Sequence, residues 1–289
     1  MPYLAPKTMR EALLHLDRGP ATLLAGGTDF FPRLGAGDLN QPTAGTIPDT
    51  LLDITRLKEL RGLTQEGTCW RIGATTTWAD IATAALPAAF DGLKQAALEV
   101  GSVQIQNRAT IAGNICNASP AADGVPPLLS LDAAVELISQ GGTRMLPLAE
   151  FITDVRQTAL AAGEMVRALH IPTPPPQARG AFVKLGSRIH LVISIAMVAA
   201  YVQVQGDNLT QVRLAVGSCS AVAQRLRVLE NHLTGMPVAA LAALPMEEAA
   251  FWEPLSPISD VRGAADYRRA VLAPLCRRAL MRACTGSPA

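Results

Sequence analysis

The sequence predicts an α+β protein made of two small α/β lobes followed by a C-terminal α+β domain. Three observations predict this class. A short apolar strand runs directly into the pair Gly26-Gly27, after which apolar character returns, as in a strand, a turn and a helix start. The proline run 172–176 breaks any regular element and marks a boundary. Beyond it, strand-sized apolar segments separated by turns precede helical stretches.

The first lobe covers about residues 1–56 and opens with a short helix. Thr8 followed by Glu11 is typical of a capping box, and Gly19 ends the helix. The elements expected in this lobe are a helix over 6–18, a strand over 21–25, a helix start over 30–34 and a strand over 51–54. A strand, glycine turn, helix and strand in this order form a small βαβ-like unit.

The second lobe covers about residues 57–176. Thr77 with Asp80 behind it predicts a capped helix start. The segment 107–120 is rich in Gly, Asn, Ser and Thr, so it is expected to be a loop and not a helix or a long strand. The other elements expected are a strand over 70–74, helices over 77–86 and 93–100, and strand-like segments over 128–131, 133–138 and 144–148.

The C-terminal domain is expected over residues 177–289. Its expected elements are strands over 182–185, 192–204 and 212–216, then helices over 225–233, 237–250 and 264–282. The apolar run Leu191–Val202 also suits a buried helix, and periodicity alone does not decide between strand and helix.

Composition excludes several classes of protein. The chain has 289 residues, 25 Lys and Arg against 24 Asp and Glu, and therefore a net charge of +1, which offers no field to hold nucleic acid. Its longest apolar run, Leu191–Val202, is shorter than the roughly 20 residues needed to span a bilayer. No membrane-spanning segment is expected, and the start of the chain lacks secretory signal features, so a cytoplasmic location is expected. Five widely spaced cysteines indicate neither zinc nor an iron–sulfur cluster in this chain.

Two segments are candidates for ligand binding. In Leu23–Asp29 a strand ends in two glycines that can adopt positive φ and present backbone N–H groups to a phosphate, although most such pairs are only turns. Thr110–Asp123 gathers Thr, Asn and Ser donors with one carboxylate, which suits a ligand with phosphates, hydroxyls and a heterocycle. An ordinary loop whose Asn and Ser side chains bind their own backbone is an equal alternative. Cys116, within the second segment, is interpreted as a small buried apolar residue.

The two segments together resemble the FAD-binding (medium) subunit of the molybdenum hydroxylases, the family of xanthine dehydrogenase and carbon monoxide dehydrogenase. The resemblance rests on AGGTD, on TIAGNICNASPAAD about 85 residues later, and on Pro257–Asp260 and Tyr267–Arg269. It covers nearly the whole chain. The family usually has glycine where this chain has Ala112, which predicts a slightly different loop with cofactor binding retained.

The resemblance implies an FAD-binding domain of the vanillyl-alcohol-oxidase type with FAD extended between its two lobes, followed by a C-terminal domain with an antiparallel sheet and helices. It assigns no catalytic or metal-binding residue to this chain. The residues that it implies for cofactor binding come from four segments and are Leu23, Leu24, Ala25, Gly26, Gly27, Thr28, Asp29, Thr110, Ile111, Ala112, Gly113, Asn114, Cys116, Ser119, Asp123, Met165, Val166 and Lys184.

The function implied is that of an FAD-dependent electron-transfer subunit. Its partners would be a large subunit with a molybdenum–pterin cofactor and a small subunit with two [2Fe–2S] clusters, assembled as a dimer of heterotrimers. Electrons would pass from a cluster through FAD to an acceptor such as NAD⁺, oxygen or a quinone. Two alternatives stay open: a stand-alone flavin oxidoreductase of the same FAD fold, and a non-catalytic assembly subunit with a vestigial flavin site.

Overall fold

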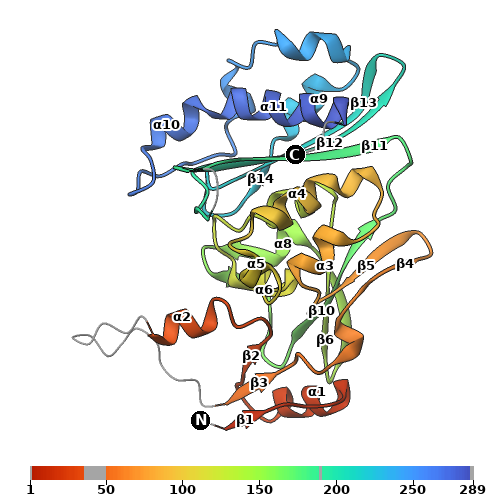
Figure 1. Ribbon diagram of the computed structural model, residues 1–289, viewed down its shortest axis with the longest axis vertical. Coiled ribbons are helices and arrows are strands. Elements are labelled where there is room, and N and C mark those ends of the chain that lie inside the picture. Colours follow the sequence, from red (N-terminus) through yellow and green to blue (C-terminus); the bar gives the residue numbers. More distant parts are fainter. Residues whose placement is uncertain (1, 36–49, 189–190, 287–289) are drawn as a thin grey trace.

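Three of the four β-sheets that the described residues form follow one another along the long axis of the molecule (Figure 1). The computed structural model describes residues 2–35, 50–188 and 191–286. The mixture of helices and mainly antiparallel sheets confirms the predicted α+β class. Within the described ranges, no helix is both long enough and apolar enough to cross a membrane.

The first sheet is small and parallel, with the strand order β1-β3-β2. Its strands and helices are β1 (Tyr3–Leu4), α1 (Met9–Asp17), β2 (Thr22–Leu24), α2 (Phe30–Gly35) and β3 (Leu51–Asp53). The predicted N-terminal cap is present, because the Thr8 hydroxyl accepts a hydrogen bond from the amide of Glu11 at 3.2 Å. The Glu11 carboxylate accepts from the amide of Lys7, so the box is shifted by one residue. The predicted strand, turn and helix around Gly26 are confirmed.

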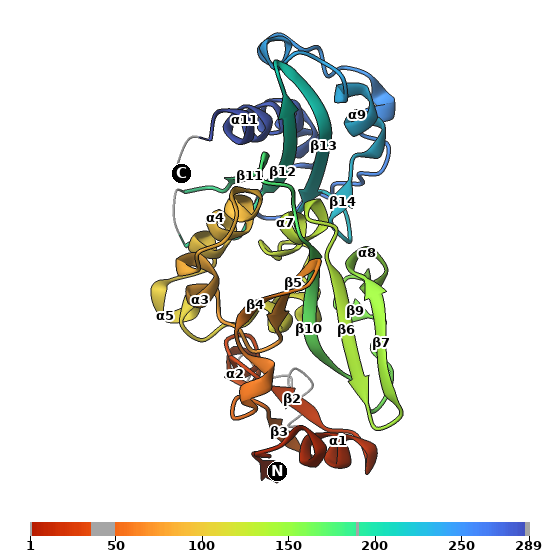
Figure 2. The same ribbon diagram turned by 90° about the vertical axis from the view of Figure 1, so that its right-hand side faces the viewer.

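The second sheet is antiparallel, with the strand order β4-β5-β10-β6-β7. Its strands are β4 (Leu63–Glu66), β5 (Cys69–Gly73), β6 (Ala134–Ser139), β7 (Gly142–Pro147) and β10 (Met165–Pro172). A separate short ribbon joins β8 (Ile152–Asp154) to β9 (Gln157–Thr158). The helical segments are η1 (Lys58–Leu60), α3 (Trp78–Thr83), η2 (Ala88–Phe90), α4 (Asp91–Glu99), α5 (Val103–Gln106), α6 (Ile111–Asn117), α7 (Val125–Ser130) and α8 (Leu148–Phe151). Figure 2 shows α3, α4 and α5 grouped on the side of the sheet away from β7.

Two predictions for this region are wrong. The segment expected to be a loop contains helix α6, which begins after a Thr110 cap that binds the amide of Gly113 and ends at Ala118 with φ of 45°. The apolar run 128–131 was expected to be strand-like, but most of it belongs to helix α7, which carries prolines in its first turn. Burial against other elements outweighs the weak local preference of the sequence in both cases, on one face of α6 and around the whole of α7.

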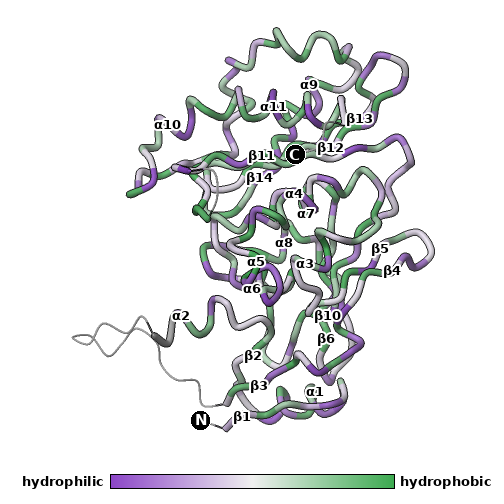
Figure 3. The backbone as a smooth tube through the Cα atoms, viewed as in Figure 1, coloured by the Kyte–Doolittle hydropathy of each residue, from purple (hydrophilic) through white to green (hydrophobic). Residues whose placement is uncertain are grey.

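The third sheet is an antiparallel meander that is sandwiched between helices. Its strands are β11 (Ala178–Leu185), β12 (Ala196–Gln205), β13 (Asn208–Gly217) and β14 (Gln224–Arg225). The helical segments after it are α9 (Arg227–Leu233), η3 (Val238–Ala242), η4 (Ala249–Phe251), α10 (Ala265–Ala270) and α11 (Leu272–Thr285). The run Leu191–Val202 therefore leads into a strand, and the helix predicted over 237–250 is reduced to short 3-10 turns. Figure 3 shows hydrophobic and hydrophilic segments alternating along α11 and the sheet beside it.

Strand β11 is an edge strand, and α4 covers it. The amide of Phe182 donates to the side-chain oxygen of Gln95 at 2.7 Å. A Cβ atom added to Gly180 would lie 2.3 Å from the carbonyl oxygen of Ala89, and one added to Gly92 would lie 3.0 Å from the backbone of Ala181. The backbones of the two segments therefore touch at glycines, which covers the middle of this edge against pairing with another strand.

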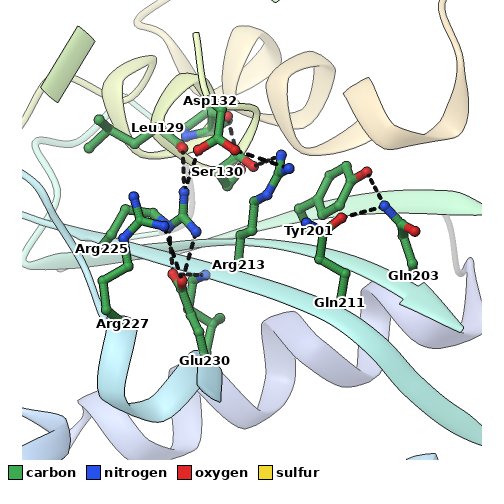
Figure 4. A network of polar contacts seen from close by, with 12 residues as sticks. Leu129, Ser130, Asp132, Tyr201, Gln203, Gln211, Arg213, Arg225, Arg227 and Glu230 are labelled. Atoms are coloured by element: carbon green, nitrogen blue, oxygen red, sulfur yellow. Dashed lines mark hydrogen bonds and ion pairs between the residues drawn. The ribbon is translucent and has the colours of Figure 1, made fainter. Parts of the chain in front are cut away.

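A polar cluster joins the end of α7 to the third sheet (Figure 4). Arg225 donates to the carboxylate of Asp132 at 2.7 Å and to both oxygens of Glu230. Arg213 reaches the same Asp132 at 3.0 Å and lies over the ring of Tyr201, 4.5 Å from its centre. Because Arg225 and Glu230 are almost fully buried, their charges depend on these partners.

The capping box of α3 makes one contribution to stability that depends on pH. Thr77 binds the amide of Asp80, and the Asp80 carboxylate binds the amide of Thr77 and, in a two-pronged contact at 3.0 Å, the guanidinium of Arg61. Burial raises the pKa of Asp80, but these hydrogen bonds outweigh burial and hold it below the ordinary value of 3.8.

We therefore expect Asp80→Asn to be less stable than the wild type by about 1 kcal/mol at neutral pH. The folded-state pKa of Asp80 is lowered, so its contribution is fully present above 3.8 and is lost as the pH falls below that value. Urea unfolding of both proteins between pH 7 and pH 3 measures the difference. If the difference in the free energy of unfolding between the two proteins were the same at pH 3 as at pH 7, this account would be wrong.

Candidate cofactor site

A cavity of about 660 Å³ lies where the first sheet meets the helices of the second lobe. Its walls come from the end of β2 and the turn after it, from α6 with the residues before it, and from β10. A volume of this size is typical of cofactor sites. The residues from the sequence analysis that line it are Leu23, Leu24, Ala25, Gly26, Gly27, Thr28, Asp29, Thr110, Ala112, Gly113, Asn114, Cys116 and Val166. The two motifs, far apart in the sequence, therefore meet at one cavity.

Glycine is required at positions 26 and 27 for two different structural reasons. Gly27 has φ of +74°, in the region that favours glycine, and its carbonyl accepts from the amide of Phe31 at the start of α2. Both glycines were expected to adopt positive φ, but Gly26 does not, so this expectation holds only for Gly27. A Cβ atom at Gly26 would lie 2.1 Å from the carbonyl oxygen of Arg108. Gly26 is therefore needed because two backbones touch beside the cavity.

A polar chain links the two lobes next to the cavity. The side-chain amide of Asn117 donates to the carboxylate of Asp29 at 2.9 Å. Arg156 donates to the backbone carbonyl of Asn117 at 3.0 Å and also to its side-chain oxygen. The Asp29 carboxylate is thereby tied to the second lobe, beside the turn that holds Gly27.

Two buried polar atoms, on residues that line the cavity, have no hydrogen-bond partner in the described part of the chain. They are the side-chain oxygen of Asn114, an acceptor, and the indole nitrogen of Trp78, a donor. Leaving such atoms unpaired costs about 1–3 kcal/mol each. A molecule bound in the cavity does not reach these two atoms, because each has almost no accessible surface and both side chains pack against Gly124, which does not line the cavity. The groups that fit FAD are those open to the cavity, namely the turn at Gly27, the hydroxyl of Thr28 and the rest of the partly exposed Asn114 side chain.

Ala112, where the resembling family usually has glycine, lies inside helix α6. It is 7% exposed and belongs to the hydrophobic core. A helical residue tolerates a methyl group, and alanine favours the helix over glycine by about 1 kcal/mol. The substitution is therefore compatible with this backbone.

Cys116 also lies on the cavity wall, and burial raises the pKa of its thiol to about 12. The thiol stays protonated at neutral pH and is a poor nucleophile. This agrees with the interpretation of Cys116 as a packing residue.

Other residues expected at the site do not line the cavity. Ile111 and Met165 are fully buried in the core behind it. The Ser119 hydroxyl accepts from the amide of Ala121 at 3.3 Å, as in the alternative of a self-bonded turn.

Asp123 and Lys184 form a buried ion pair at 2.8 Å. The hydroxyl of Ser194 donates to the same carboxylate, and the Lys184 ammonium also donates to the carbonyl of Glu99. Burial raises the pKa of Asp123, and the contacts with Lys184 and Ser194 offset only part of this effect. The pair joins the loop before α7 to strand β11.

Sequence reasoning missed several residues that line the cavity. They are Ala21, Thr22, Phe30, Ile54, Ala74, Trp78, Val100, Ile105, Ala109, Asn117, Leu160 and Glu164. Two of them had a local signal, because Asn117 lies within the candidate segment Thr110–Asp123 and the Thr77 cap places Trp78 at the first position of a helix. The Glu164 carboxylate binds Arg144 at 2.7 Å, and this hydrogen bond lowers the pKa of Glu164.

Comparison with known families gives two matches that together cover most of the chain. Residues 1–174 match the FAD binding domain in molybdopterin dehydrogenase. Residues 181–283 match the CO dehydrogenase flavoprotein C-terminal domain. The exact domain limits, 1–176 and 177–289, stay predictions.

Individual relatives agree with these matches. The nicotinate dehydrogenase FAD-subunit of Eubacterium barkeri is 33% identical over 82% of this chain and 80% of its own length. The putative xanthine dehydrogenase FAD-binding subunit of Escherichia coli (strain K12) is 30% identical over 97% of this chain and 95% of its own length. The carbon monoxide dehydrogenase medium chain of Hydrogenophaga pseudoflava is 28% identical over 96% and 95%.

Solved structures match the whole chain. The reconstituted CO dehydrogenase from Oligotropha carboxidovorans contains a chain with a TM-score of 0.88 and 27% identity, which covers 99% of this chain and 98% of that one. The cavity where two glycine-bearing motifs meet, the family matches and the shared fold agree: this chain belongs to the family of FAD-binding medium subunits of molybdenum hydroxylases and is a flavoprotein subunit of an oxidoreductase.

Proposed function

We propose that this chain binds FAD in the cavity between its two lobes and passes electrons from iron–sulfur clusters of a partner subunit to an external acceptor. The meeting of the two motifs at one cavity carries the proposal. Bound FAD supplies the ability to take up and release one or two electrons. The chain supplies the position, the surrounding dielectric and the hydrogen bonds.

The cavity residues have distinct roles in this proposal. Backbone amides of the turn at Gly27 and the hydroxyl of Thr28 would hold phosphate oxygens. The side-chain N–H₂ group of Asn114, a partly exposed residue that lines the cavity, would donate to an acceptor atom of the cofactor. Apolar residues such as Val166 would exclude water. Asp123, Lys184 and Ser119 do not line the cavity, so their assignment to the cofactor stays a prediction.

The partners in this proposal are a large subunit with a molybdenum–pterin cofactor and a small subunit with two [2Fe–2S] clusters, arranged as a dimer of heterotrimers in the cytoplasm. The names of the relatives as medium chains and FAD subunits of dehydrogenases support the presence of partners. The acceptor is proposed to be NAD⁺, oxygen or a quinone.

The proposal is tested by purifying the chain with its native partners. We expect the complex to contain FAD, iron and molybdenum, and its flavin absorbance to bleach when the substrate of the molybdenum subunit is added. Flavin that stays oxidised while the iron–sulfur clusters are reduced would reject the electron-transfer role. A chain that carries FAD and oxidises a substrate without partners would instead support a stand-alone oxidoreductase.

The role of Asn114 is tested separately from the partners. We expect Asn114→Ala to weaken FAD binding by about tenfold, because one buried hydrogen bond is worth about 1–1.5 kcal/mol. Fluorescence titration of the flavin-free chain gives the Kd. Asn208→Ala, an exposed asparagine on the third sheet, is the matched control and should leave the Kd unchanged. Equal affinity of both variants would show that the side chain does not contact the cofactor.

A further inference from the structure

Three chemically reactive side chains lie together on neighbouring strands of the second sheet. Cys69 begins β5, His170 lies on the central strand β10, and Glu136 lies on β6. None of the three lines the cofactor cavity. The residue opposite His170 on β5 is Arg71, two positions from Cys69, which places Cys69 and His170 on the same face of the sheet.

The distances arrange the three groups in a line. The Cys69 sulfur is 3.7 Å from Nδ1 of His170, and Nε2 of the same ring is 2.8 Å from the carboxylate of Glu136. Arg167 donates to the other carboxylate oxygen at 2.9 Å. Burial raises the pKa of Glu136, but the contacts with His170 and Arg167 outweigh it and hold this pKa below its ordinary value.

The ionised carboxylate fixes the role of each ring nitrogen. It can only accept, so Nε2 of His170 must carry the proton that it donates to Glu136. In the neutral ring Nδ1 is then an acceptor, and it faces the sulfur of Cys69. A nucleophile, a base beside it and an acidic group that orients the base form the arrangement that activates thiols in proteins.

The other cysteines have a different environment. Burial raises the pKa of Cys116 and Cys276 to about 12 and that of Cys219 to about 11, and it also raises the pKa of Cys284. These four thiols are therefore held in the unreactive protonated form. Cys69 is only partly buried, so small reagents can reach it. Its sulfur lies beside the His170 imidazole and can also donate to the carbonyl oxygen of Glu66 at 3.4 Å.

We propose that Cys69 is a reactive thiol that forms mixed disulfides with low-molecular-weight disulfides, with His170 as its base and Glu136 as the group that positions His170. The sulfur of Cys69 attacks one sulfur of the disulfide while its proton passes to Nδ1 of His170. A new S–S bond forms as the old one breaks, and the departing thiolate takes up the proton. Cys69 is oxidised and one half of the small disulfide is reduced, so electrons and atoms balance.

The adduct would lie close to the connection between the second and third sheets. Cys69 pairs with Pro172, the last residue of β10. The neighbouring amide of Thr173 donates to the carbonyl of Thr68 at 2.9 Å, and the chain then continues into the third sheet at Ala178. The inference concerns this chain's own chemistry and does not depend on the proposed electron transfer.

The test is the rate of reaction of each thiol with dithiobisnitrobenzoate, an aromatic disulfide, followed by its colour and assigned by peptide mass spectrometry. We expect Cys69 in the wild-type chain to react at least about tenfold faster than Cys284, which is also partly buried but has its pKa raised by burial. A wild-type Cys69 that reacts no faster than Cys284 would overturn the proposal without any variant.

Two variants then separate activation by His170 from simple exposure. His170→Asn is expected to lower the reaction rate of Cys69 by about tenfold, and Glu136→Gln is expected to lower it by less. The reaction rate of Cys284 in the same sample should stay constant, which makes it an internal control for folding. A constant Cys284 rate together with an unchanged Cys69 rate in His170→Asn would reject the imidazole as the base.

Discussion

Gly26→Val is expected to lower the affinity for FAD by about 100-fold, so that the chain purifies folded but colourless. The Cβ atom of the new side chain would lie 2.1 Å from the carbonyl oxygen of Arg108, and backbone atoms cannot move aside as a flexible side chain can. The turn that carries Gly27 and Thr28 must therefore shift away from the segment between α5 and α6, which opens the cavity between the motifs. Flavin content after purification and the Kd from titration measure the effect.

Gly141→Val is the matched control for this substitution. Gly141 lies in the exposed turn between β6 and β7, and a Cβ atom there meets only the Ser139 hydroxyl, at an ordinary 3.5 Å. The control should keep its flavin. If Gly26→Val also retains stoichiometric flavin, the touching backbones beside Gly26 are not required for the cofactor site.

Arg225→Met is expected to destabilise the chain by about 3–5 kcal/mol. The substitution keeps most of the side-chain volume but removes the donors to Glu230 and Asp132. Glu230 is 4% exposed, so it would become a buried charge that has lost its nearest partner. Buried Arg225 keeps its charge, since burial lowers its pKa but the bonds to Glu230 outweigh burial and raise it. Thermal unfolding followed by circular dichroism checks the prediction.

Arg227→Met provides the comparison, since Arg227 lies on helix α9 with Glu230, two residues beyond Arg225 at the end of β14. The guanidinium of Arg227 lies 3.8 Å from Glu230, but its side chain is 67% exposed, so its loss should cost less than about 1 kcal/mol. Similar losses for the two variants would mean that burial of the Arg225 pair does not determine its contribution.

Local patterns in the sequence predicted the elements that depend on local contacts. The Thr77–Asp80 box involves residues three positions apart, and the turn at Gly27 needs only a glycine with positive φ, so both can be recognised in a single sequence. The same holds for the apolar strand that precedes this turn. The meeting of the two motifs at one cavity came from resemblance to a family and not from pattern.

Contacts between distant segments explain most of what was missed. Helix α6 contains Gly113 and Asn114, which are poor helix formers, and is stabilised by burial of Ile111 and Ile115 against other elements. Trp78 reaches the cavity only because the first lobe closes over α3 and α6. No spacing rule predicts that closure. Helix α7 could have been recognised from its two prolines, which are tolerated in the first helical turn.

The glycine contact between α4 and β11 restricts which chimeras can be built from two members of this family. A Cβ atom at Gly180 would clash with the carbonyl oxygen of Ala89, and Gly92 of α4 packs closely against the backbone of Ala181 beside it. A chimera that takes its C-terminal half from a relative will therefore dock only if the donor has glycine at the position of Gly180. Steric fit at this contact therefore limits which relatives can exchange their C-terminal halves, whatever reaction each relative takes part in.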